Sequence, residues 1–309
     1  MSVASAYDPL KVPDVKTASR TFDVTCAGRT LPLGIYLPVS ELPAPVILFS
    51  HGLGGSRDNN PYLGNHWAKR GYAVVFIQHP GSDDKVWKDA SRFQRMGAMK
   101  EAASGKNRIH RVKDIPAVID ALTDWNATVG NPLKGRLNLK RIGMSGHSFG
   151  AVTTQALAGQ ALAGGRASFP ESRLSAAVMF SPGPPKVGDP ATAFGPVKIP
   201  CLLMTGTHDD SPIGETTPAD RLQVFPHLSR APAWQVVFDQ ANYMSFGERE
   251  KAQGGSRYHR AILALTTAFW DAQLRGNKEA AAWLNSPAAR SVLVPADRWE
   301  MNRRAKDGR

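Results

Sequence analysis

Residues 139–150 read LKRIGMSGHSFG, and this stretch decides the fold class of the chain. Its second half, Gly146-His147-Ser148-Phe149-Gly150, fits the G-x-S-x-G nucleophile elbow, in which a serine stands on a sharp turn between a strand and a helix. The turn is strained and crowded, so its flanking positions must lack side chains. Small residues follow and suit a helix whose N-terminal end favours an anion beside the serine. Ser148 is therefore the candidate nucleophile.

A second glycine-rich loop lies well upstream of the serine. An apolar strand at 45–49 runs into Ser50-His51-Gly52-Leu53-Gly54-Gly55. Acyl transfer builds negative charge on a carbonyl oxygen, and each backbone N–H that stabilises it contributes about 3 kcal/mol in comparable enzymes. We expect the two donors of this oxyanion hole to be the amides of Leu53 and Phe149. The loop lacks the Lys-Ser/Thr ending of a phosphate-binding loop and the spacing of a dinucleotide fingerprint.

The acid of a catalytic triad should follow the next-to-last strand of the sheet. The apolar run 201–206 leads into Thr207-His208-Asp209-Asp210 at that point. We choose Asp209 as the residue that orients the base and stabilises its cation. Asp210 is the alternative, because the register of a turn can shift by one residue.

The base is where the sequence departs from the pattern. Enzymes with this elbow carry serine, acid and histidine in that order. The loop at 239–247 resembles the loop that carries the base in such enzymes, and this resemblance implies that Tyr243 stands at the position of the histidine. A phenol with a pKa near ~10 accepts a proton poorly at neutral pH, and loss of the base can cost about 10⁴ to 10⁶ in turnover. Three accounts follow. His259 serves as an alternative base, the chain binds esters without turning them over, or a nearby cation lowers the pKa of Tyr243 enough to make it the base.

The two glycine-rich phrases together resemble the platelet-activating-factor acetylhydrolase and predicted dienelactone hydrolase group, with bacterial polyester hydrolases as more distant relatives. Further matches are Tyr62-Leu63-Gly64, Gln78-His79-Pro80-Gly81-Ser82-Asp83 and Thr266-Thr267-Ala268-Phe269-Trp270-Asp271. The similarity covers most of residues 20–285, and Asp209 stands in a G-x-x-D pattern typical of the group. The resemblance implies an α/β-hydrolase fold and hydrolysis of a carboxylic ester. True dienelactone hydrolases use a cysteine nucleophile, whereas this elbow carries a serine.

Strand-like and helix-like stretches alternate along most of the chain, which predicts an α/β fold with a mostly parallel central sheet and helices on both faces. The expected strands are 22–25, 33–37, 46–50, 73–78, 141–144, 176–180, 201–205 and 235–239, and the clearest helices are 114–125 and 257–274. We divide the chain into an N-terminal extension at 1–20, a catalytic domain at 21–285 and a basic C-terminal tail at 286–309.

Three further predictions concern the surroundings of the site. The polar and basic stretch 85–108 lies where such folds place loops over the pocket, so we expect it to face substrate. His79, in the turn after a strand, and Phe246, in the loop of Tyr243, are predicted to bind substrate.

The chain carries a formal net charge of +12, but its basic residues are scattered and no aromatic-basic motif accompanies them. We therefore expect no nucleic-acid partner, although the positive potential can steer an anionic substrate. The ligand spacing of a metal hydrolase is lacking and no cofactor is expected.

The predicted function is hydrolysis of a small-molecule or polymeric ester through an acyl-enzyme, with an amidase or peptidase as the enzymatic alternative and a silent ester-binding protein as the other. No run is long and apolar enough to span a membrane, and residues 1–15 lack an apolar signal core. We expect a cytoplasmic protein, or alternatively a periplasmic or secreted one after trimming. The oligomeric state stays open.

Overall fold

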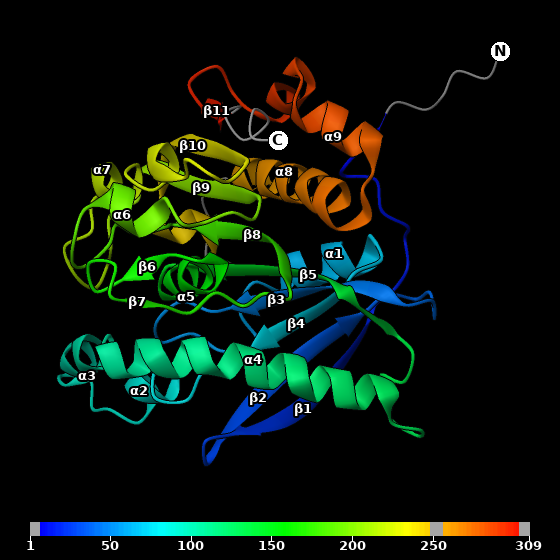
Figure 1. The fold of residues 1–309 in the computed structure, drawn as a ribbon, viewed down its shortest axis with the longest axis horizontal. Coiled ribbons are helices and arrows are strands. Elements are labelled where there is room, and N and C mark those ends of the chain that lie inside the picture. The colour runs from blue at the N-terminus through cyan, green and yellow to red at the C-terminus, as the bar shows by residue number, and fades with distance from the viewer. Residues whose placement is uncertain (1–6, 248–255, 303–309) are drawn as a thin grey trace.

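The computed structural model describes residues 7–247 and 256–302, and its centre is a nine-stranded sheet (Figure 1). The order of strands across the sheet is β1-β2-β4-β3-β5-β8-β9-β10-β11. Their bounds are β1 Ala18–Cys26, β2 Arg29–Leu37, β3 Ala44–Ser50, β4 Ala73–Ile77, β5 Leu137–His147, β8 Leu174–Phe180, β9 Cys201–His208, β10 Ala233–Asn242 and β11 Arg298–Asn302. A separate two-stranded sheet pairs β6 (Ala161–Leu162) with β7 (Ala167–Ser168).

The strands from β4 to β10 run parallel, and antiparallel pairs occur only towards the two edges of this sheet. β3 and β4 are almost entirely buried and rich in β-branched and aromatic residues, as strands covered on both faces must be. The predicted α/β-hydrolase fold is confirmed. Strand β11, from the stretch expected as a tail, pairs with β10 and extends the sheet.

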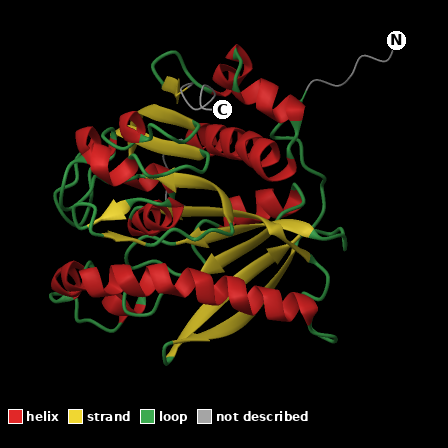
Figure 2. Cartoon of the chain, viewed as in Figure 1, coloured by secondary structure: helices red, strands yellow, loops and turns green. Residues whose placement is uncertain are grey.

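Helices cover both faces of the sheet (Figure 2). The helices are α1 Pro61–Lys69, α2 Lys85–Lys88, α3 Arg95–Ala102, α4 Gly105–Ala127, α5 Phe149–Ala158, α6 Pro190–Phe194, α7 Pro218–Arg221, α8 Ser256–Arg275 and α9 Lys278–Leu284. Helices α1, α8 and α9 share one apolar core with the sheet, and α4 and α5 share a second core on the opposite face. Within the two described ranges, no helix is long and apolar enough to cross a bilayer.

The carboxyl ends of the parallel strands bring the candidate residues to one edge. β3 ends at Ser50, β5 at His147, β9 at His208 and β10 at Asn242, and each strand is followed at once by one of the predicted site loops. Because these strands run the same way, the four loops meet at the same edge of the sheet. Ligands of open α/β sheets bind at this edge.

Candidate active site

Ser148 stands in a strained backbone conformation between β5 and α5. Its φ of 55° and ψ of −112° lie where non-glycine residues are rarely found, and its N–H donates to the carbonyl of Phe180 at 2.9 Å. A Cβ on Gly150 would lie 1.9 Å from the carbonyl oxygen of Ser50, and one on Gly146 would lie 2.3 Å from that of Gly150. Gly150 is therefore required for the start of α5 to pack against the end of β3, and Gly146 for it to pack against the end of β5.

The amides of Leu53 and Phe149 are available to a ligand. Within residues 7–247 and 256–302, the Leu53 amide donates to no other backbone group. Phe149 is the first residue of α5, so its amide has no partner inside the helix. Both residues line the same pocket as Ser148. This is the arrangement that an oxyanion hole needs.

Arg111 on α4, which sequence reasoning missed, holds the loop that carries Leu53. Its side chain is fully buried and donates to the carbonyl of His51 at 2.6 Å and to the hydroxyl of Ser82 at 2.8 Å. The guanidinium also lies 4.6 Å from the centre of the Phe149 ring. Burial lowers its pKa to about 9, while Asp114 and Asp83 act in the opposite direction. One buried cation thus contacts both sides of the candidate oxyanion hole.

Replacing Arg111 with methionine is expected to slow the reaction of Ser148 with a fluorophosphonate about 10- to 100-fold, because the loop loses the hydrogen bonds that position one N–H donor. The rate of adduct formation, followed by intact mass, measures this effect on protein that a melting curve shows to be folded. Arg136→Met removes an arginine at the opposite end of β5 from Ser148, outside the pocket lining, and serves as the control. Equal rates in the two variants would contradict the assigned role of Arg111.

His79 belongs to a buried hydrogen-bond chain behind the loop. Its Nε2 is 2.9 Å from the hydroxyl of Ser50, and its Nδ1 is 2.8 Å from a carboxylate oxygen of Asp114. The side chains of His79 and Asp114 are both fully buried. Burial and the nearby Arg111 lower the pKa of His79 to about 4, so the ring is neutral at pH 7. This placement corrects the predicted substrate contact of His79, because the ring supports the end of β3 and does not line the pocket.

Asp209 is buried at the end of β9, whereas its alternative Asp210 is exposed. Its Oδ2 accepts from the hydroxyl of Thr205 at 2.8 Å and pairs with Nε of Arg221 at 3.2 Å. Its Oδ1 is buried and makes no hydrogen bond to the described residues, although the hydroxyl of Ser181 is close enough to lower the pKa. Burial outweighs Arg221 and raises the pKa of Asp209 to about 6.

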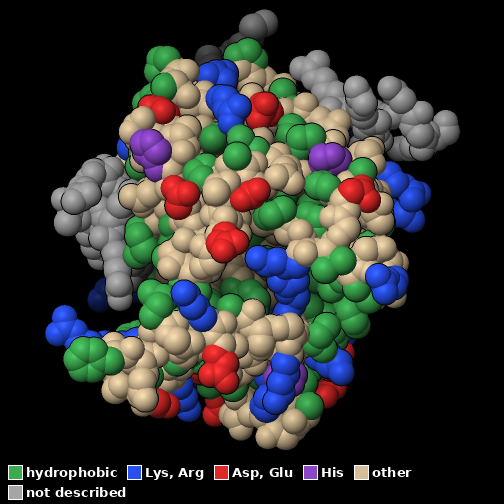
Figure 3. Space-filling view, turned by 90° about the vertical axis from the view of Figure 1, so that its left-hand side faces the viewer, with side chains coloured by type: hydrophobic (Ala, Val, Ile, Leu, Met, Phe, Trp, Pro, Cys, Tyr) green, Lys and Arg blue, Asp and Glu red, His purple; other side chains and the backbone are tan. Residues whose placement is uncertain are grey.

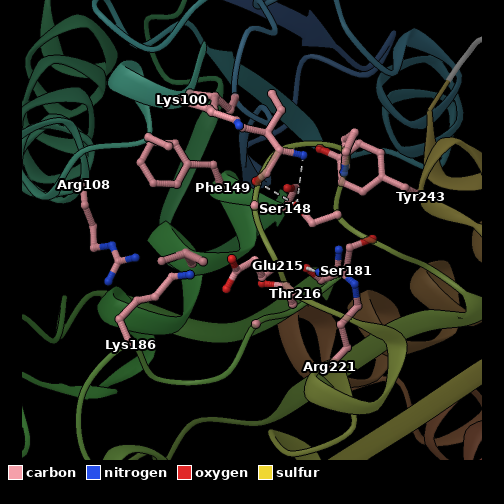
Figure 4. Close-up of a pocket in the computed structure, with 18 residues that line it drawn as sticks. Lys100, Arg108, Ser148, Phe149, Ser181, Lys186, Glu215, Thr216, Arg221 and Tyr243 are labelled. Carbon is pink, nitrogen blue, oxygen red and sulfur yellow. Dashed lines mark hydrogen bonds between the residues drawn. The ribbon is translucent and has the colours of Figure 1, made fainter. Parts of the chain in front are cut away.

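Tyr243 occupies the first position after β10 and faces the nucleophile (Figure 4). Its phenol is close enough to Ser148 for that side chain to lower its pKa, and its ring lies 4.6 Å from that of His147 and 6.0 Å from the guanidinium of Arg221. Loss of hydration raises the pKa of Tyr243, because it outweighs the lowering by Ser148 and Arg221. The phenol is therefore neutral at pH 7. This argues against the hypothesis that a nearby cation lowers the pKa of Tyr243 enough to make it the base.

Two further predicted residues lie outside the pocket. His259 on α8 stacks on the ring of Tyr62 at 4.0 Å, and its Nε2 is 3.0 Å from the carbonyl of Gly247. Phe246 is 1% exposed and packs in the core beside Phe180 and Phe238. Neither residue lines the pocket, which corrects their predicted roles as alternative base and substrate contact.

The pocket at this edge of the sheet has a volume of about 560 Å³, and Ser148, Leu53, Phe149 and Tyr243 line it. Figure 3 faces this end of the molecule and shows a hollow with Lys, Arg and acidic side chains around it. The stretch 85–108 contributes Lys100, Ala103 and Arg108 to the lining, so it does face the pocket. In the described part of the chain, no group of three His, Cys, Asp or Glu residues is placed to hold a metal ion.

The sheet and the elbow at the end of β5 define an α/β-hydrolase of the serine hydrolase class. Residues 27–297 match the family model described as X-Pro dipeptidyl-peptidase (S15 family), and the chain belongs to that family. No curated protein matches the sequence. The family supports the fold and the hydrolase class, and it gives no support to the acetylhydrolase and dienelactone hydrolase group in particular.

Proposed function

We propose that the protein cleaves a small-molecule carboxylic ester through an acyl-enzyme on Ser148. The observation that carries this proposal is the strained serine in a pocket that Leu53 and Phe149 also line, with no backbone hydrogen bond from either amide among the described residues. The serine oxygen attacks the carbonyl carbon, the alcohol leaves, and water then hydrolyses the acyl-enzyme. The two amides stabilise the negative oxygen in both steps.

Proton transfer is the slow part of this reaction. Asp209 is in place to orient a base, but the neighbouring position holds the neutral phenol of Tyr243. The serine proton must then pass to solvent, and the rate rests on the oxyanion hole and on binding, which in triad enzymes still give about 10³- to 10⁴-fold over water. We expect a slow enzyme.

The same feature favours esters over amides. An amine leaves only after it has been protonated, and in triad enzymes the imidazolium supplies that proton. Ester leaving groups depend less on a general acid, so a site without an imidazole retains more activity on esters. The description of the family nevertheless keeps a peptidase as the alternative substrate class. A specific relationship to the platelet-activating-factor acetylhydrolase group, suggested by the sequence motifs, is also part of this proposal.

A second candidate is a binding protein that holds an ester without cleaving it. The observation that favours it is Tyr243 itself, because a phenol with a raised pKa accepts no proton at neutral pH.

Labelling with a fluorophosphonate separates the two candidates. We expect the wild-type protein to gain the mass of one adduct, and the Ser148→Ala variant to gain none. We also expect p-nitrophenyl valerate to be hydrolysed faster than the matched p-nitroanilide. An unlabelled wild-type protein that still binds the ester would favour the silent protein, and faster cleavage of the anilide would favour the amidase.

A further inference from the structure

The pocket beside Ser148 is positively charged on one side. Lys100 on α3, Arg108 on α4 and Lys186 in the loop after β8 all line it. Figure 4 shows Arg108 and Lys186 on the opposite side of the pocket from Tyr243, with Ser148 between them and the tyrosine. The cations therefore surround a region next to the candidate nucleophile and away from the base position.

None of these three cations lies within 4.0 Å of a carboxylate oxygen in the described part of the chain, and Asp220 acts on Lys186 only from farther away. Ion pairs within 4.0 Å there involve other side chains, and the fourth cation of the lining, Arg221, is paired with Asp209. Among the described residues that line the pocket, Glu215 is the one carboxylate. The described lining therefore has three unpaired cations against one carboxylate, which is an excess of positive charge.

Arg108 is the cation whose donors most need a partner. Its Nε is buried from solvent and has no hydrogen-bond partner among the described residues. A buried guanidinium N–H without an acceptor costs free energy that a ligand oxygen can recover. Arginine also presents its donors in a planar fork that matches a carboxylate.

We infer that the pocket selects esters whose acyl chain ends in a carboxylate, with Arg108 and Lys186 as the residues that recognise it. This inference rests on the proposed function and names its substrate class. A dicarboxylic acid monoester places its ester carbonyl at Ser148 and its free carboxylate at the cationic side. The exposed ammonium groups of Lys100 and Lys186 attract the anion over a longer range, an effect that salt screens.

Binding to the Ser148→Ala protein tests this inference without any chemistry. We expect monoethyl glutarate to bind about 10- to 100-fold more tightly than ethyl valerate, which carries a methyl group in place of the carboxylate. Isothermal titration at low ionic strength measures both affinities. Adding Arg108→Gln should remove most of the preference, Lys186→Gln should reduce it, and higher salt should weaken it.

The matched control is Lys113→Gln, which removes one charge from an exposed position of the same helix. It should leave the preference for the glutarate ester intact.

Equal affinity for the two esters, no measurable binding of either, or an equal effect of Arg108→Gln and Lys113→Gln would overturn the inference. So would tighter binding of the methyl ester of Ala-Pro, whose cationic amine suits Glu215. Failure of the proposed function would appear separately, as a wild-type protein that a fluorophosphonate does not label.

Discussion

The Tyr243→His variant is expected to hydrolyse p-nitrophenyl valerate about 10² to 10⁴ times faster than the wild-type protein, the range that a positioned general base contributes. The replacement puts an imidazole between Ser148 and Asp209, whose Oδ1 is buried and has no hydrogen-bond partner among the described residues. The carboxylate then holds the imidazole in the correct tautomer and stabilises its cation. The measurement is kcat/KM as a function of pH, and we expect activity to rise as the imidazole loses its proton.

The control for this prediction is Tyr243→Phe, which removes the phenol oxygen and supplies no base. It should stay within about tenfold of the wild-type rate, because the neutral phenol offers no base to lose. If Tyr243→His and Tyr243→Phe had the same low activity, position 243 would not be the base position. The gain should also vanish when Asp209→Asn is added, since the amide cannot stabilise the cation.

The Gly150→Ala variant is expected to lose more than about 3 kcal/mol of stability, because a methyl group there overpacks a backbone contact that cannot relax. The new Cβ would lie 1.9 Å from the carbonyl oxygen of Ser50 and 2.9 Å from that of His51. Where the protein still folds, α5 must move away from β3, which separates the Phe149 amide from the Leu53 amide. Urea unfolding measures the stability, and the rate of fluorophosphonate labelling measures the site.

Gly97→Ala is the matched control, because a Cβ at this position of α3 meets nothing within 4 Å. Alanine is the better helix former, so this variant should gain about 0.5–1 kcal/mol. Replacing glycine with alanine is thus expected to lower the stability at position 150 and to raise it at position 97. A Gly150→Ala protein with unchanged stability and unchanged labelling would show that the close approach of α5 and β3 is not required.

The sequence predicts the architecture well, because its signals are local. Buried apolar runs such as 46–50 and 73–77 predict strands by themselves, and the G-x-S-x-G motif predicts the turn at Ser148. The fold then brings the loops at Leu53, Asp209 and Tyr243 to one edge of the sheet.

The sequence does not indicate whether an individual side chain points into the core or into the pocket. Phe246 follows Tyr243 by three residues, yet its ring enters the core while that of Tyr243 lines the pocket. No sequence pattern identified Arg111 as a site residue, because its partners are backbone carbonyls and hydroxyls that the fold brings in from distant parts of the chain. Arg108 lies one helical turn earlier on α4 and lines the pocket, while the neighbouring Lys113 is exposed. The way α4 packs decides which of these three cations is buried, which lines the pocket and which faces solvent.

A crystal structure of the protein with a phosphonate bound to the serine shows the nucleophile and the oxyanion hole together. We expect a covalent bond to Oγ of Ser148 and a phosphonyl oxygen within about 3 Å of the amides of both Leu53 and Phe149. An adduct on another residue, or a phosphonyl oxygen turned away from these two amides, would contradict this expectation.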